Sequence, residues 1–243
     1  MQRQAYHYLS SALDAFCDDK LPTIQTDFDL PFVAPPTAMG FSRVAGERSF
    51  DTNARLRQFL GRTWPGMSPA ERREAVYYYV RDWGGVKGHL DETLPSYADR
   101  TEVEIVTHSE LDGVASWSKV LSFRMRSSYA ILDARVAAAL NAIQVVYGSG
   151  LTYRFPKLPS KSSKVVPFDE LLDDTFPDVP RIGRTGLYLS YCDLLQRAFE
   201  RYQNRHSSGL HWHAVETALF FHSPQLMACA VDHPNWQRIT QKV

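Results

Sequence analysis

The segment ARVAAALNAIQVV at residues 134–146 is the feature that most constrains the fold. It has the length of a helix and is rich in alanine, and apolar residues cover most of its helical surface. A surface helix, in contrast, carries its apolar residues as a stripe on one face. Residues 134–146 therefore predict a helix that is buried deep in a core.

The rest of the chain also favours a mostly α fold. Ser68-Pro-Ala-Glu71 has the form of a capping box with proline at the first helical position, and predicts a helix to about Asp82 that breaks at Trp83-Gly84-Gly85. Strand candidates, such as residues 151–155, are few. Further helices are predicted at residues 3–17, 51–59, 107–115, 116–126, 186–204 and 210–223, with irregular chain at 20–50 and 148–184. We expect one domain over residues 1–243, either a single body or two helical halves that flank a cleft.

Composition argues against several classes of protein. No apolar run reaches the roughly 18 residues that span a bilayer, and the first 20 residues lack the apolar core of a secretory signal. Cys17, Cys192 and Cys229 lie far apart without a CxxC spacing, which argues against a disulfide framework and a zinc knuckle. We therefore expect a cytoplasmic protein that does not bind a membrane.

The charge is unevenly distributed. The net charge is zero, but residues 117–165 hold eight Lys or Arg residues against the single acid Asp133, a local charge of +7 that the remaining chain balances. Such a basic field attracts a polyanion to one face, although a solvated surface with uneven charge would give the same count. The cations expected to contact DNA are Arg124, Arg126, Arg135, Lys157, Lys161 and Lys164.

Lys119 and Asp133 are the candidate chemical pair. A helix that begins at Ser116 or Ser118 would hold Lys119 in its first turn, where the helix dipole and partial burial lower the pKa of an amine and favour a nucleophile. Asp133 stands directly before the helix of residues 134–146, as an N-cap whose carboxylate stays ionised. A fixed carboxylate stabilises a developing oxocarbenium-like sugar, so the pair suits cleavage of a glycosidic bond.

These residues also carry a resemblance to a family. The segment LDGVASWSKV, residues 111–120, resembles the hairpin and lysine of the helix-hairpin-helix DNA glycosylases, in particular the 8-oxoguanine branch, and ILDARV, residues 131–136, resembles their aspartate element. The resemblance implies a helix-hairpin-helix fold, Lys119 as the Schiff-base nucleophile and Asp133 as the essential carboxylate. It implies as partner a double-stranded DNA with a modified base, such as 8-oxoguanine or a hypermodified cytosine of phage DNA. The chain is also similar to bacterial proteins of this fold that are associated with defence against phage.

A glycosylase must extrude its target nucleotide into a pocket. Trp83, Gly84 and Gly85 are the candidate pocket residues, because glycines allow the backbone to approach a base on which Trp83 stacks, although glycines also end helices. Trp117 either lines the pocket or fills the core.

Two other functions remain open at this point. The chain could be a DNA-binding or modified-base-binding protein without catalysis, or a metal-dependent hydrolase that uses a cluster between His211 and Glu216, with His206 and His213. Glycosylase chemistry needs no metal, so we expect neither a metal nor a cofactor, and no obligate protein partner.

Overall fold

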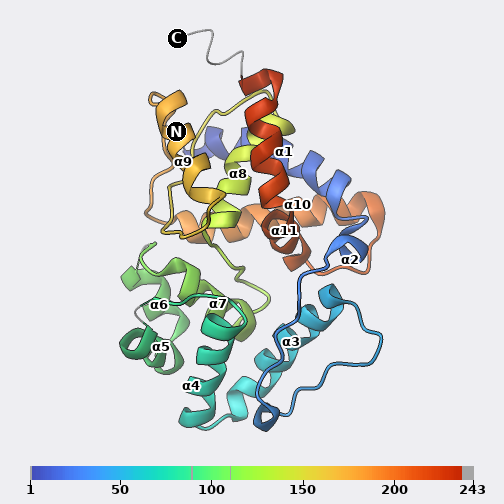
Figure 1. The fold of residues 1–243 in the computed structure, drawn as a ribbon, viewed down its shortest axis with the longest axis vertical. Helices are drawn as coiled ribbons and strands as arrows, with labels where there is room; N and C mark the ends of the chain where they lie inside the picture. The colour runs from blue at the N-terminus through green and yellow to red at the C-terminus, as the bar shows by residue number, and fades with distance from the viewer. Residues whose placement is uncertain (1, 89, 110, 237–243) are drawn as a thin grey trace. The chain divides into compact units, whose positions relative to one another are not determined.

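The computed structural model describes residues 2–88, 90–109 and 111–236. Over these residues the fold is mostly helical, as the sequence predicts, and no strand is present apart from an isolated bridge between Arg154 and Arg181 (Figure 1). No helix among the described residues is long and apolar enough to cross a membrane.

The chain divides into two compact units. The first combines residues 1–22 with residues 133–243, and the second comprises residues 23–132. The first unit contains α1 (Gln2–Lys20), α8 (Ala134–Val146), α9 (Val165–Thr175), α10 (Leu187–His206) and α11 (His213–Asp232). The second contains α2 (Ile24–Asp27), η1 (Thr37–Met39), α3 (Ser49–Thr63), η2 (Trp64–Gly66), α4 (Pro69–Tyr77), η3 (Tyr78–Asp82), α5 (Leu90–Asp99), α6 (Glu102–Ser109) and α7 (Val114–Arg124).

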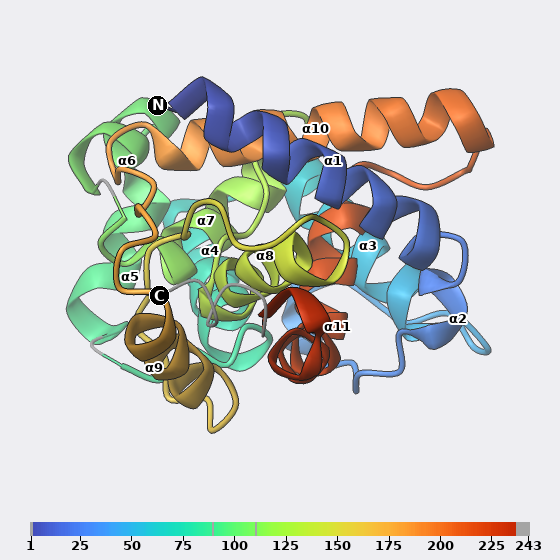
Figure 2. The same cartoon turned by 90° about the horizontal axis from the view of Figure 1, so that it is seen from above.

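Helix α8 is the core of the first unit. Nearly all of its residues are buried, and it contacts α1, α9 and α11, which enclose it in Figure 2. Its two buried side-chain amides form hydrogen bonds with the chain that follows the helix. Asn141 Oδ1 accepts from the backbone N–H of Phe155 at 2.7 Å, and Gln144 Nε2 donates to the carbonyl of Tyr153 at 2.9 Å. The amides attach the irregular chain after α8 to its side, because buried polar groups need partners.

Helices α1 and α10 are joined along one edge of this unit. Arg201 donates to both carboxylate oxygens of Asp14 and to Ser10, and Asp18 accepts from Arg205 and His206 one turn further on. The N-terminal helix is thereby held against a helix almost 190 residues later in the chain.

Several predicted boundaries need correction. The capping box at Ser68 is present and opens α4, but the helix then widens into a π-helical turn at Tyr78–Asp82 before it ends at Trp83. The helix predicted at 51–59 begins at Ser49, so Asp51 lies in its first turn and does not cap it. The helix predicted at 107–115 is wrong: α6 covers Glu102–Ser109 and α7 begins at Val114, while residue 110 lies outside the described residues. Helices α5 and α9 were not predicted, and α9 lies within the residues 148–184 that were expected to be irregular.

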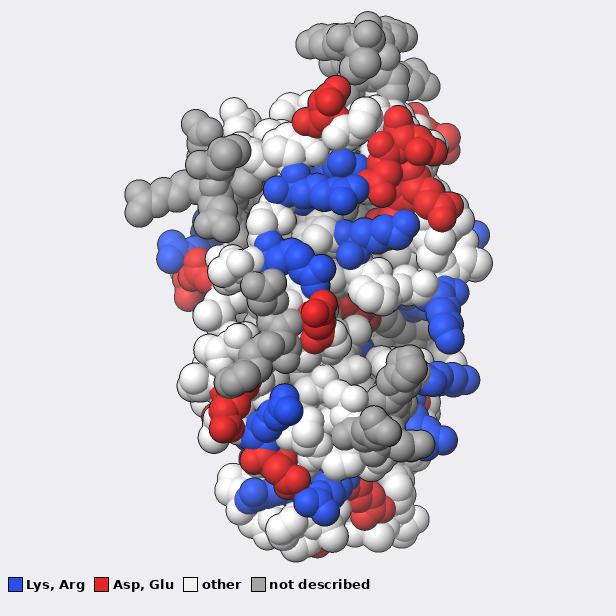
Figure 3. Space-filling view, turned by 90° about the vertical axis from the view of Figure 1, so that its left-hand side faces the viewer, with Lys and Arg blue, Asp and Glu red and all other residues white. Residues whose placement is uncertain are grey.

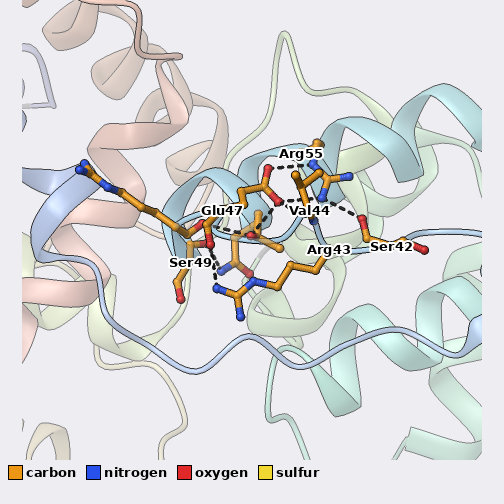
Figure 4. Close-up of polar contacts among 9 residues, drawn as sticks. Ser42, Arg43, Val44, Glu47, Ser49 and Arg55 are labelled. Atoms are coloured by element: carbon orange, nitrogen blue, oxygen red, sulfur yellow. Dashed lines mark hydrogen bonds and ion pairs between the residues drawn. The ribbon is translucent and has the colours of Figure 1, made fainter.

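A carboxylate clamp orders the irregular segment before α3. Both oxygens of Glu47 accept from Arg55, at 2.8 and 2.7 Å, and Arg55 also donates to the carbonyl of Ser42 and covers the ring of Phe41 (Figure 4). The hydrogen bonds from Arg55, with those from Thr52 and the backbone of Val44, lower the pKa of Glu47 to about 2. The clamp therefore ties this segment to α3 through a carboxylate that stays ionised.

The clamp predicts a pH-dependent stability. Replacing Glu47 by Gln should lower the Tm by about 2–4 °C at pH 7, because a bidentate ion pair of roughly 1 kcal/mol is lost. The folded-state pKa is depressed, so the contribution is present above the ordinary value of 4.5 and is lost as the pH falls toward about 2. Thermal melts between pH 2 and 7 should show the two proteins converging at the acid end. Glu74→Gln, at an exposed position, is the control, and a Tm gap that persists at pH 2 would contradict the assignment.

Candidate functional site

The candidate site in the second unit begins at the turn between α6 and α7. Gly113 caps α7 with a positive φ of 67°, a conformation that glycine adopts without strain. A side chain there would also meet the hydroxyl of Tyr97, since a Cβ would lie 3.0 Å from it. The start of α7 therefore depends on a glycine.

Trp117 belongs to the core. It is fully buried, and its indole N–H donates to the carbonyl of Asp112 at 2.9 Å. The side chain therefore anchors the turn between α6 and α7 from inside, and we remove Trp117 from the candidate base pocket.

Lys119 lies in the second turn of α7, because the helix begins at Val114 and the cap is Gly113. The prediction of a first-turn position is wrong, and the helix dipole is correspondingly weaker at the amine. The side chain is only 3% exposed, and Nζ donates to the carbonyl of Ala115 at 2.8 Å.

Gly84 packs directly against Lys119. A Cβ at this glycine would lie 2.6 Å from Cε and 2.7 Å from Cδ of the lysine, and 2.7 Å from the carbonyl oxygen of Val80. The space for the lysine side chain therefore exists because residue 84 has none of its own. The structure brings together Lys119 and one of the glycines that the sequence assigned to the pocket.

The neighbouring aromatic residues come from the π-helical turn. Tyr79 and Trp83 are stacked, with ring centroids 4.3 Å apart and an interplanar angle of 8°, and the indole N–H of Trp83 donates to Asn53. The edge of the Tyr79 ring packs on Phe123, one turn after Lys119 on α7. A π-helical turn shifts the register of the helix by one residue and is frequent at functional sites. In this turn Tyr79 contacts Phe123 of α7, and Trp83 stacks on Tyr79.

Asp133 is the N-cap of α8, as predicted. Its Oδ1 accepts from the backbone N–H of Arg135 at 3.0 Å and of Val136 at 3.1 Å, and the side chain is half-buried. Asp133 is the first residue of its segment in the first unit, whereas Lys119 lies in the second. Within the second unit, the backbone N–H of Leu132 donates to the hydroxyl of Ser118 at 3.1 Å. The same hydroxyl donates to the carbonyl of Leu132 at 3.4 Å.

The cations predicted to contact DNA fall into separate groups. Lys157, Lys161, Lys164 and Arg135 are exposed, and Arg135 also covers the ring of Phe220. Figure 3 shows a face on which Lys and Arg side chains gather beside a group of acidic ones. Arg126 is half-buried.

Arg124 is a structural residue. Its guanidinium donates to the carbonyls of Tyr97 and Arg100 and to Glu102, and it covers the ring of Trp64. The side chain is 9% exposed. We therefore leave Arg124 out of the DNA contacts proposed below.

The histidines of the C-terminal region do not form a metal centre. His206 bonds Asp18 at 2.9 Å, while His213 and Glu216 are buried in the first turn of α11. Among the residues that the structure describes, no group of three or more His, Cys, Asp or Glu side chains is arranged to hold a metal ion. The metal-hydrolase hypothesis has no site there, and we do not pursue it.

Comparison of the chain with protein-family models, with curated proteins and with solved structures gave no match. The candidate site therefore has to be argued from its own residues.

The contact between Gly84 and Lys119 predicts that a side chain at residue 84 destabilises the protein. Gly84→Ala should destabilise the protein by about 1–3 kcal/mol, because the added methyl group collides with a buried side chain and a backbone carbonyl. Gly66→Ala, where nothing lies within 4 Å of the added Cβ, is the matched control and should cost far less. Urea unfolding measures both. In a Lys119→Ala background the cost of Gly84→Ala should fall, and an unchanged cost would show that the lysine does not occupy this space.

Proposed function

We propose that the protein is a DNA glycosylase that excises a modified base from double-stranded DNA, with Lys119 as nucleophile and Asp133 as the carboxylate that stabilises the sugar cation. The observation that carries the proposal is the buried amine of Lys119 on the helix after a glycine turn, in a space left open by Gly84. A lysine amine is a nucleophile that forms Schiff bases with sugars, and this is the role proposed for Lys119.

The proposed reaction uses both residues on one extruded nucleotide. The glycosidic bond breaks and its electron pair leaves with the base, while the carboxylate of Asp133 stabilises the positive charge that develops on the deoxyribose. The amine of Lys119 then bonds to C1′ and loses a proton, and opening of the sugar ring gives a Schiff base. Extrusion is required because the bond is inaccessible in the base stack.

A second candidate function is binding of DNA or a modified base without catalysis. It is favoured by the hydrogen bond from Lys119 Nζ to Ala115, which a purely structural lysine would also form. Formation of an abasic site separates the candidates, since a binding protein retains the base on the sugar.

Trapping of the intermediate tests the chemistry. With duplexes bearing 8-oxoguanine or hypermodified cytosines and with borohydride, the wild-type protein should form a covalent adduct that Lys119→Gln does not form. Asp133→Asn should slow base release by about 10²–10³-fold, because a preorganised charge at the reacting centre is removed. Lys87→Gln, an exposed lysine of the same unit as Lys119, should behave as wild type. Unchanged base release in both Lys119→Gln and Asp133→Asn would refute the mechanism, and binding without release by the wild type would favour the second candidate.

The exposed lysines predict how DNA affinity responds to salt. Replacing Lys157, Lys161 and Lys164 together by Gln should weaken binding to all sequences alike. The slope of log K against log[salt] should become shallower by up to about three, since each lost phosphate contact removes about 0.9. Fluorescence anisotropy from 50 to 300 mM salt measures the slope, with Lys20→Gln as control. An unchanged slope would place the DNA contacts elsewhere.

A further inference from the structure

Helix α9 buries a carboxylate within its apolar face. The buried residues of this helix are Val165, Phe168, Asp169 and Leu172, which follow the i, i+3, i+4, i+7 spacing of an apolar stripe. An apolar side chain is expected at each position of such a stripe, but residue 169 is an aspartate that is only 7% exposed. The surface through which α9 packs in the first unit therefore includes one ionisable group.

Asp169 has no hydrogen bond or ion pair with any of the residues that the structure describes. The arginines that reach α9 bind Asp173, one turn further along the helix. Asp173 Oδ1 accepts from Arg154 at 2.7 Å and from Arg181 at 2.5 Å. A buried charge costs free energy unless it is paired or hydrogen-bonded. The packed helix is therefore more stable when the carboxyl of residue 169 is neutral.

We propose that α9 is a pH-sensitive element of the first unit, which packs firmly while the carboxyl of Asp169 holds a proton and loosens when the proton is lost. In the packed helix the proton stays on the carboxyl. When the helix opens, the carboxyl meets water and releases the proton to it. This property is independent of the proposed glycosylase chemistry.

Charged residues act on Asp169 in opposite directions. Burial raises the pKa of its carboxyl from the ordinary value of 3.8 to about 6. Lys157 and Arg181 lower this pKa, whereas Asp173 and Glu170, on the same helix, raise it. Because the pKa in the packed helix lies above the ordinary value, opening becomes more favourable as the pH rises from about 4, and the effect levels off above about 6.

The main contacts of α9 with other helices are with α8 and α11. The charged or titratable residues of these two helices are Arg135, on α8, and His213, Glu216, His222, Cys229 and Asp232, on α11. Within the described part of the chain, none of them forms a hydrogen bond or an ion pair with Asp169. Neither helix thus supplies a counter-ion that would hold this carboxyl in its charged form.

Opening of α9 also affects the lysine-containing segment before it. The hydroxyl of Ser162 accepts from the backbone N–H groups of Lys164 and Val165, at 3.3 and 3.4 Å. The backbone N–H of Val166 donates to the carbonyl of Ser162 at 3.1 Å. The segment with Lys161 and Lys164 is therefore continuous with the first turn of α9, and it gains freedom when the helix opens.

Hydrogen exchange at different pH values tests this property. After correction for the intrinsic pH dependence of exchange, the amides of α9 in the wild-type protein should exchange about 20-fold faster at pH 7.5 than at pH 4.5. The reason is that the open helix binds the proton about a hundred times more weakly than the packed one. Asp169→Asn keeps the shape of the side chain without its charge and should lose the pH dependence, as should Asp169→Leu, which completes the apolar stripe. Asp174→Asn, at an exposed position of the same helix, is the matched control and should respond as the wild type does. No pH dependence in the wild type, or an undiminished one in both variants at residue 169, would overturn the proposal.

An NMR titration of the wild-type protein locates the proton without any substitution. The carboxyl carbon of Asp169 should titrate with a midpoint near pH 6. A midpoint near the ordinary value of 3.8 would overturn the proposal even if exchange in α9 depends on pH, since another group would then be the cause.

Discussion

The burial of α8 is the constraint on which the first unit depends. A helix with apolar residues on nearly every face has no side that can face water, so α1, α9 and α11 are needed to cover it. This requirement also explains why residues from both ends of the chain belong to one unit. The N-terminal helix covers the centre and is held to α10 by Arg201 and Asp14. The N-cap of α8 is Asp133, the carboxylate proposed for catalysis. Both the stability of α8 and the proposed chemistry therefore need an acceptor oxygen at this position.

The second unit depends on close approach between helices. Gly61 and Gly84 each stand where a Cβ would collide with a neighbour, in one case the backbone of Phe123 and in the other the side chain of Lys119. Missing side chains at these positions let α3, the π-helical turn and α7 meet. Several polar groups lie there as a result: the amine of Lys119, the guanidinium of Arg57, the phenol of Tyr79 and the indole of Trp83. Buried polar groups cost stability unless they are hydrogen-bonded, and here Lys119, Arg57 and Trp83 each donate to a partner.

The basic residues that lie close together in the sequence differ in their exposure in the structure. The basic window of residues 117–165 suggested a single DNA-facing surface, but Lys119 and Arg154 in it are buried and the side chain of Arg124 is only 9% exposed. Arg124 binds backbone carbonyls and Glu102, and Arg154 binds Asp173 and the carbonyls that end α9. Arg135 and the lysines of residues 157–164 are therefore the exposed cations of the window. Counting charges along a chain cannot separate these roles, because a guanidinium is as readily used inside a fold as on its surface.

The sequence by itself determined the helical class, the bounds of α8, the cap at Asp133, the capping box at Ser68 and the break at Trp83. Each of these depends on periodicity or on hydrogen bonds within a few residues. It also singled out Lys119 and Gly84, but not the contact between them. Only the tertiary structure decided that Lys119 lies in a second turn, that Trp117 fills the core, that Arg124 is structural and that Arg57 donates to Tyr79. These outcomes depend on which distant helices pack together, and spacing along the chain carries no information about such long-range neighbours.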